Sequence, residues 1–160
     1  MIEIKDIKIS LGSKLEQNSM LEKQLNLKKG SIYKLTGIKK RYIAEKNETS
    51  ESLAIKACKQ IKVKDIKKIS HIISVTNTQK NRFPGISNII SEFFQITDVH
   101  CINLNQGCTG YVDAMQIASN ILRENKKFNI LIVTSDTYSK FINKKNKSVR
   151  CLFSDGASAS

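Results

Sequence analysis

The chain has 160 residues, of which 40% are hydrophobic, so it is long enough and apolar enough for one globular domain with a core. No apolar run approaches the roughly 18 residues that a membrane span requires, and the N-terminal residues mix charged with apolar side chains, unlike a signal peptide. The four cysteines lie far apart, without a pair or a neighbouring histidine at a zinc-binding spacing. We therefore expect a single cytoplasmic domain with no membrane span, no metal site and no disulfide framework.

The formal net charge of +13 has two interpretations, because a basic surface attracts nucleic acid, acidic membranes or acidic proteins. Only four of the 27 basic residues are arginines, and the chain is also rich in Ile and Asn, as expected of an AT-rich coding sequence. Aromatic residues for base stacking are sparse, at 6% with no Trp. The composition therefore favours a lysine bias over nucleic-acid binding, and an acidic protein partner is compatible with it.

Hydrophobic periodicity predicts two strands and two helices in the first half of the chain. Residues 2–11 alternate apolar and polar side chains with one phase slip, which indicates a strand with a bulge. Residues 18–27 have the apolar spacing of a helix, and a second helix begins at Thr49 or Ser50. Residues 69–75 are apolar and largely β-branched, which is typical of a strand buried on both faces.

The second half of the chain continues the alternation of helices and strands. Residues 83–94 are predicted to be helical, with Pro84 in the first turn, and residues 99–104 form the next strand. A helix over residues 108–124 and a buried strand over residues 128–134 follow. This order predicts a layered α/β fold, in which helices flank a mixed, mostly parallel sheet.

Cys108 is the strongest candidate for a reactive residue. It lies between Gly107 and Gly110, after a strand and at the start of an amphipathic helix. The positive end of the helix dipole and the free N–H groups there favour a thiolate, which is a nucleophile. A small buried apolar role is the alternative, and it is the interpretation that we give to Cys58, Cys101 and Cys151.

Five short segments, in order along the chain, carry a more specific pattern. They are Thr36–Ala44 (TGIKKRYIA), Glu48–Ser50, Val75–Thr78 with Phe83-Pro84, Gly107–Tyr111 (GCTGY) and Leu152–Ala157 (LFSDGA). Each motif is weak alone, but together their order and spacing resemble the first half of the β-ketoacyl-acyl-carrier-protein synthase III family. The resemblance implies one half of a thiolase-like fold, with residues 1–160 as the N-terminal half and the C-terminal half absent.

Members of this family transfer an acyl group from a thioester to the cysteine and condense it with malonyl-acyl-carrier protein by decarboxylation. The resemblance therefore implies an acyltransferase of fatty acid or related biosynthesis, in which Cys108 is the acyl acceptor. It implies acyl-coenzyme A or acyl-carrier protein as substrate, no further cofactor, and a homodimer. The family stabilises the decarboxylation with a histidine and an asparagine from its second half.

Neither histidine of this chain is expected to replace that second-half pair. His100 begins the strand that leads to Cys108, and eight extended residues span about 26 Å. His71 also lies near the start of a strand, whereas catalytic groups of α/β sheets gather at the carboxyl ends. Both histidines are therefore expected to be structural or exposed.

Other positions of the resemblance concern substrate binding. The family often carries a tryptophan and an arginine that stack the coenzyme A adenine, and this chain has Ser31 and Leu35 in that segment. A carrier-protein-bound acyl donor is therefore an alternative to acyl-coenzyme A. Lys147 stands near a phosphate-facing arginine of the family, and its alternative is a solvated charge. Phe83 resembles a residue that reaches into the partner subunit's acyl pocket, with ordinary packing as its alternative.

Two functional hypotheses follow from these observations. The first is a condensing enzyme whose second half is missing or encoded separately. The second is a non-catalytic half-domain that acts as a structural or interaction module.

Overall fold

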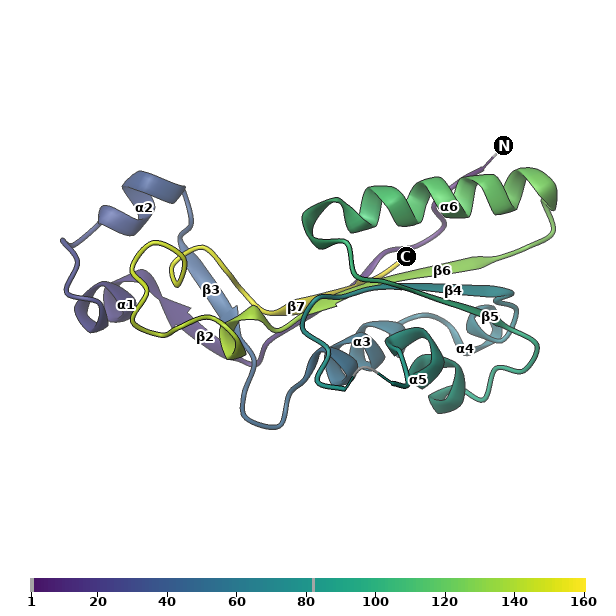
Figure 1. The fold of residues 1–160 in the computed structure, drawn as a ribbon, viewed down its shortest axis with the longest axis horizontal. Helices are drawn as coiled ribbons and strands as arrows, with labels where there is room; N and C mark the ends of the chain where they lie inside the picture. Colours follow the sequence, from purple (N-terminus) through teal and green to yellow (C-terminus); the bar gives the residue numbers. More distant parts are fainter. Residues whose placement is uncertain (1, 82) are drawn as a thin grey trace.

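A five-stranded mixed sheet forms the centre of the computed structural model, which describes residues 2–81 and 83–160 (Figure 1). The strand order is β1-β7-β6-β4-β5. Strands β6, β4 and β5 run parallel to one another, and β7 and β1 continue the sheet with antiparallel pairings. The strands are β1 (Lys8–Leu11), β4 (His71–Val75), β5 (His100–Leu104), β6 (Ile130–Asp136) and β7 (Gly156–Ala159).

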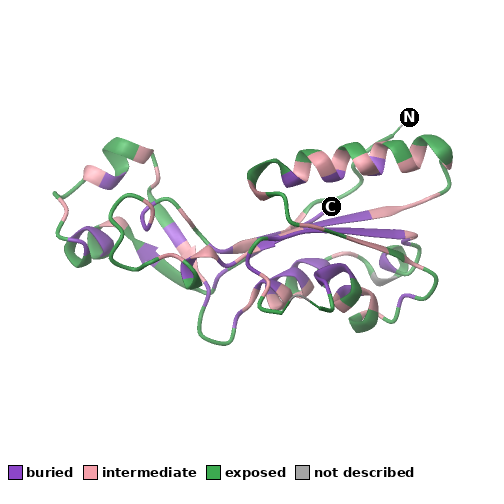
Figure 2. Ribbon diagram, in the orientation of Figure 1, coloured by how far each residue is buried: buried purple, intermediate pink, exposed green. Residues whose placement is uncertain are grey.

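Helices cover both faces of the sheet (Figure 1). Helices α3 (Ser50–Cys58), α4 (Val63–Ile66) and α5 (Ile86–Phe93) lie on one face, and α6 (Gly110–Glu124) lies on the other. All five residues of β4 are buried, because the strand is covered on both faces, as Figure 2 shows. The core on the α3 side includes Leu53, Ala54, Ile72, Ile86 and Ile90, and the core under α6 includes Ile73, Val75, Ala114, Ala118 and Ile132.

A smaller lobe lies at one end of the molecule (Figure 1). It consists of the antiparallel pair β2 (Lys14–Gln17) and β3 (Lys40–Ile43), with helices α1 (Asn18–Gln24) and α2 (Ser31–Thr36). Its apolar cluster contains Leu21, Leu25, Ile32 and Cys151, so the segment that precedes β7 packs against it.

A buried ion cluster joins this lobe to the segment before β7. Glu16 accepts from Arg41 Nε at 3.1 Å and from Arg150 Nη2 at 2.5 Å. Arg41 also donates to the carbonyl of Cys151 at 3.1 Å. One carboxylate therefore pairs with two guanidinium groups whose side chains are withdrawn from water, and the hydrogen bond to the Cys151 carbonyl adds to the stabilisation of Arg41.

Most of the elements predicted from periodicity are present, but several boundaries were wrong. The first strand is confined to Lys8–Leu11, and Pro84 precedes α5 instead of lying in its first turn. The last helix begins at Gly110, after a 3₁₀ turn over Gly107–Thr109. Helix α2 and the β2–β3 pair were not predicted, because each is only four to six residues long and too short to show a period.

Apolar side chains are exposed on the edge strand β1 and on helix α6. Ile9 and Leu11 of β1 are 59% and 46% exposed, whereas Ser10 between them is buried and faces the α3 side. Val112 of α6 is 68% exposed. Among the helices of the described residues, none is both long and apolar enough to cross a membrane.

Glu48 organises the loop that leads into α3. Its carboxylate accepts from the backbone N–H and the hydroxyl of Ser13 at 2.9 and 2.7 Å, and from the backbone N–H of Glu45 at 3.0 Å. Lys56 pairs with it at 2.5 Å. Burial raises the pKa of this carboxyl, but the hydrogen bonds from Lys56, Ser13 and Glu45 outweigh burial and lower it from 4.5 to about 2.

Glu48→Gln is expected to lower the free energy of unfolding by about 2 kcal/mol at pH 7, because charge-assisted hydrogen bonds are lost. The wild-type advantage is fully present above pH 4.5 and shrinks as the pH falls toward about 2, since the folded state binds the proton less readily than the unfolded state. Urea unfolding of the wild type and of Glu48→Gln at a series of pH values between 7 and 3 measures this difference in the free energy of unfolding. An equal difference at pH 7 and pH 3 would contradict the assignment.

Candidate active site

Cys108 lies at the carboxyl edge of the parallel strands. Val75, the last residue of β4, pairs in register with Leu104, the last residue of β5, and with Thr134 near the end of β6. The chain continues from β5 into the 3₁₀ turn that holds Cys108, and then into the fifteen residues of α6. Of the chain's four cysteines, Cys108 is the exposed one. It therefore stands at the edge where loops after parallel strands converge, with its thiol open to a reactant.

Two glycines determine the shape of this turn. Gly107 has a φ of +57°, a conformation that other residues adopt with strain. A Cβ atom on Gly110 would lie 2.3 Å from Cγ1 of Val75, so only glycine lets the start of α6 approach β4 this closely. The glycines flanking Cys108 are thus explained by backbone conformation on one side and packing on the other.

Hydrogen bonds tie the turn to the ends of β4 and β6. The backbone N–H of Gly107 donates to Oδ1 of Asn77 at 3.2 Å. The backbone N–H of Asn77 in turn donates to Oδ1 of Asp136, the last residue of β6, at 2.8 Å. The hydroxyl of Thr78 donates to the same Asp136 oxygen at 2.8 Å. Sequence reasoning missed Asn77 and Asp136, although their positions after strand ends were the available signal.

The phenol of Tyr138 belongs to the same neighbourhood. Its pKa is raised, first because the side chain is partly buried and then because Asp136 and an ionised Cys108 are negatively charged. A hydrogen bond with the Asn77 side chain opposes this shift. The Tyr138 phenol therefore stays protonated near neutral pH, and no motif of the sequence pointed to it.

An open pocket of about 760 Å³ adjoins the turn through Asn77. It lies between the loop after β4, the start of α5 and the end of β5. Its lining is rich in carboxamide side chains, which are Asn77, Gln79, Asn81, Asn88, Asn103 and Asn105. Phe83 also lines this pocket and is 87% exposed, so its ring is not part of the core.

Lys147 lies in a different part of the structure from Cys108. It is exposed, on the segment between β6 and β7, and its carbonyl accepts from the thiol of Cys151 at 3.4 Å. Cys151 belongs to the apolar cluster of the smaller lobe. The structure therefore places Lys147 with this lobe, and it brings Phe83 but not Lys147 to the pocket beside Cys108.

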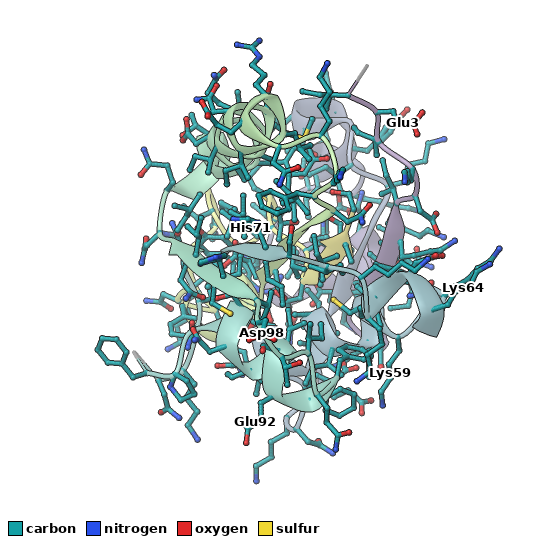
Figure 3. The ribbon with its side chains drawn as sticks, turned by 90° about the vertical axis from the view of Figure 1, so that its right-hand side faces the viewer. Glu3, Lys59, Lys64, His71, Glu92 and Asp98 are labelled. Atoms are coloured by element: carbon teal, nitrogen blue, oxygen red, sulfur yellow. The ribbon has the colours of Figure 1, made fainter. Side chains whose placement is uncertain are left out.

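The two histidines lie at the opposite end of the strands. His71 and His100 are the first residues of β4 and β5, they pair in register, and their rings stack at 4.8 Å. Figure 3 looks onto this end of the molecule, where His71 lies near Phe128, with ring centroids 5.1 Å apart. Five-residue strands thus separate both histidines from the edge that carries Cys108.

The other cysteines differ from Cys108 in their surroundings. Cys58 on α3 is fully buried, and burial raises the pKa of its thiol to about 12. Cys151 is buried in the smaller lobe, and Cys101 within β5 is half-buried. A buried thiol of high pKa is inert toward electrophiles, so Cys58 has a packing role.

Comparisons with known proteins agree with this geometry. Residues 102–160 match the model of the family described as 3-oxoacyl-[acyl-carrier-protein (ACP)] synthase III. A β-ketoacyl-[acyl-carrier-protein] synthase III of Pasteurella multocida (strain Pm70) is 30% identical over 158 residues, which cover 94% of this chain and 50% of the relative. A β-ketoacyl-[acyl-carrier-protein] synthase III 2 of Bacillus anthracis is 30% identical over 145 residues, which cover 89% of this chain and 44% of that protein.

Solved structures give the same answer for the fold. A crystal structure of a 3-oxoacyl-(acyl-carrier-protein) synthase III is similar with a TM-score of 0.89 and 31% identity, over 98% of this chain and 48% of that one. The enzyme of this name from Aquifex aeolicus VF5 has a TM-score of 0.88 and 27% identity, over 96% and 50% of the two chains. The predicted thiolase-like fold is confirmed. By sequence and by fold the chain is related to these synthases, and it spans about half the length of the curated relatives it matches.

The histidine pair gives a testable pH dependence. Burial lowers the pKa of His71 below 6.5, and the charge of His100 lowers it further. Since the folded state then binds the proton less readily than the unfolded state, the free energy of unfolding falls as the pH drops below 6.5.

His71→Phe removes the titrating group, and we expect it to flatten this slope in urea unfolding series between pH 7 and pH 5. His100→Gln is the matched control. It removes only the neighbouring charge, so it flattens the slope less. A His71→Phe protein with the wild-type slope would show that another group titrates.

Proposed function

We propose that this chain is the N-terminal, cysteine-bearing half of a β-ketoacyl-acyl-carrier-protein synthase III-type condensing enzyme of fatty acid or related biosynthesis. The observation that carries the proposal is the exposed Cys108 in a glycine-flanked turn at the carboxyl edge of the sheet. The match to the synthase III family model includes this turn, helix α6 and strands β6 and β7. Cys108 is the acyl acceptor in this proposal, and the cytoplasm is its place of action.

The chemistry of acyl transfer to Cys108 requires two groups. The thiolate attacks the thioester carbonyl, the resulting tetrahedral oxyanion collapses, and the donor's thiolate leaves and takes up a proton. The backbone N–H of Cys108, in the turn before α6, is a suitable donor to the oxyanion, and the positive end of the helix stabilises negative charge there. Both groups come from this chain.

The condensation step requires groups that this chain does not bring to Cys108. Decarboxylation of a malonyl thioester places negative charge on the thioester oxygen, which the family neutralises with a histidine and an asparagine of its second half. His71 and His100 lie at the opposite ends of their strands and cannot serve this oxygen. We infer that acylation of Cys108 is the half-reaction available to this chain, and that a C-terminal half completes the cycle.

The acyl donor is a thioester of coenzyme A or of an acyl-carrier protein, with no separate cofactor. Leu35 is 84% exposed and Ser31 begins α2, so neither supplies the planar or charged group that holds an adenine nucleotide. The exposed Lys147 lies among further lysines, Lys144 and Lys145, and such a patch attracts the acidic surface of a carrier protein. These observations favour the carrier protein, with Lys147 as a contact residue.

Phe83 supports a homodimer as the functional state. Its ring is 87% exposed and lines an open pocket, so it is free to contact a second subunit. We assign it to the acyl pocket of a partner subunit, where an aromatic ring limits the room for the acyl chain.

A non-catalytic half-domain is the second candidate function. The exposed Ile9 and Leu11 of β1 and Val112 of α6 favour it, because an apolar surface of this kind serves association. This candidate predicts no covalent chemistry at Cys108, so a single experiment separates the two.

Incubation with acyl-coenzyme A or acyl-carrier protein is expected to add one acyl group to the protein, as measured by intact mass. Cys108→Ala abolishes the adduct, because the nucleophile is removed. Cys101→Ala is the matched control, since its half-buried thiol lies within β5, and it retains the adduct. Absence of an adduct on the wild type, or an adduct that survives Cys108→Ala, would favour the non-catalytic half-domain.

A further inference from the structure

We propose that Asn77, held in place by Asp136, is a positioning residue for acyl transfer to Cys108. This inference rests on the function proposed above. Neither residue touches the reacting atoms directly. They act by fixing the backbone of the turn from which the thiol and the oxyanion donor project.

The anchor of this arrangement is one oxygen of Asp136. Oδ1 accepts from the backbone N–H of Asn77 at 2.8 Å and from the hydroxyls of Thr78 at 2.8 Å and Thr76 at 3.3 Å. The hydroxyl of Thr78 also accepts from the backbone N–H of Thr137 at 2.8 Å. The loop that follows β4 is thereby fixed to the end of β6, and Asn77 has a defined direction.

The side chain of Asn77 connects the fixed loop after β4 to the turn that holds Cys108. Its Oδ1 accepts from the backbone N–H of Gly107 at 3.2 Å, one residue before Cys108. Gly107 has a φ of +57°, and a glycine can leave this conformation without a side-chain clash. A fixed N–H on Gly107 sets the orientation of the next peptide, which carries the N–H of Cys108. That N–H is the oxyanion donor of the proposed reaction, and such donors act only when they are preorganised.

Because the Asn77 side chain is exposed, its truncation can be used to test a positioning role without a large loss of stability. The Asn77 side chain is exposed and lies outside both core clusters of the sheet. Its truncation removes a hydrogen bond to the turn and the one with the Tyr138 side chain, but no apolar packing, so the fold is expected to survive. The expected effect of the truncation is a less fixed backbone conformation in the turn of Cys108.

Two reactions of the same thiol test this proposal. Transfer of an acetyl group from acetyl-coenzyme A passes through an oxyanion and depends on the backbone donor. Alkylation by iodoacetamide is a displacement at carbon, in which iodide leaves and no oxyanion forms. Asn77→Ala is expected to slow acetylation of Cys108 about 10-fold or more and to change its alkylation less than about twofold. Peptide mapping assigns both adducts to Cys108.

Variants of Asp136 extend the test. Asp136→Ala removes the anchoring oxygen and is expected to reproduce the effect of Asn77→Ala. Asp136→Asn keeps an Oδ1 acceptor and is expected to restore most of the acetylation rate. Asn120→Ala is the matched control, because Asn120 is an exposed amide on α6 that does not line this pocket and whose side chain accepts from Gln116 at 3.1 Å. It is expected to acetylate at the wild-type rate.

Three outcomes would overturn the proposal. These are a wild-type acetylation rate in Asn77→Ala, an equal loss of acetylation and alkylation, and an equal loss in Asn120→Ala. If the wild type accepts no acetyl group from acetyl-coenzyme A or from acetyl-acyl-carrier protein, the proposed function fails, and hydrogen exchange of the amides of residues 107–109 decides the positioning separately. Faster exchange in Asn77→Ala supports the arrangement, and unchanged exchange overturns it.

Discussion

The parallel register of the fully buried strand β4 determines where the reactive groups of this protein meet. Val75 lies beside Leu104 of β5 and Thr134 of β6, so the three strands reach one edge together. The loops that leave this edge carry Asn77, the turn of Cys108 and Asp136. A slip in register would separate the turn of Cys108 from Asn77 and Asp136 without altering any single element. The close contact between Gly110 and Val75 adds a second constraint, because it fixes the start of α6 against β4.

The smaller lobe depends on a different interaction, the cluster of Arg41, Glu16 and Arg150. Burying three charges costs desolvation, and the hydrogen bonds of Glu16 to both guanidinium groups offset that cost. Removal of Glu16 would leave two buried guanidinium groups without a carboxylate partner, so the cluster holds the segment before β7 against this lobe. Lys147 lies on that segment, before Arg150. The proposed carrier-protein contact and the acyl-acceptor cysteine are thus organised by two separate parts of the fold.

Periodicity predicted the long or fully buried elements well, because burial imposes a pattern on the sequence. The strand around Ile72 and the helix through Ala114 and Ala118 are examples. It failed where burial is partial. Residues 2–7 alternate like a strand, yet they form none, since only Lys8–Leu11 pair with β7. Cys108 was recognised because its flanking glycines leave a local signature. Asn77 and Asp136 leave only their positions at strand ends, and Tyr138 leaves no signal, because the relation of all three to Cys108 exists only after three strands align.

The positions of the polar groups separate the two steps of the proposed reaction, acylation and condensation. Acylation requires a thiol and a backbone donor, which the turn before α6 supplies, and a fixed turn, which Asn77 and Asp136 supply. Condensation requires a proton-bearing group near the new carbanion, and the histidines that might serve lie at the amino ends of β4 and β5. Their stacking buries His71 and lowers its pKa, which suits a packed neutral ring and not a donor to substrate. In the proposed function, the groups for condensation therefore come from outside the described sheet, because neither histidine lies at the edge that carries Cys108.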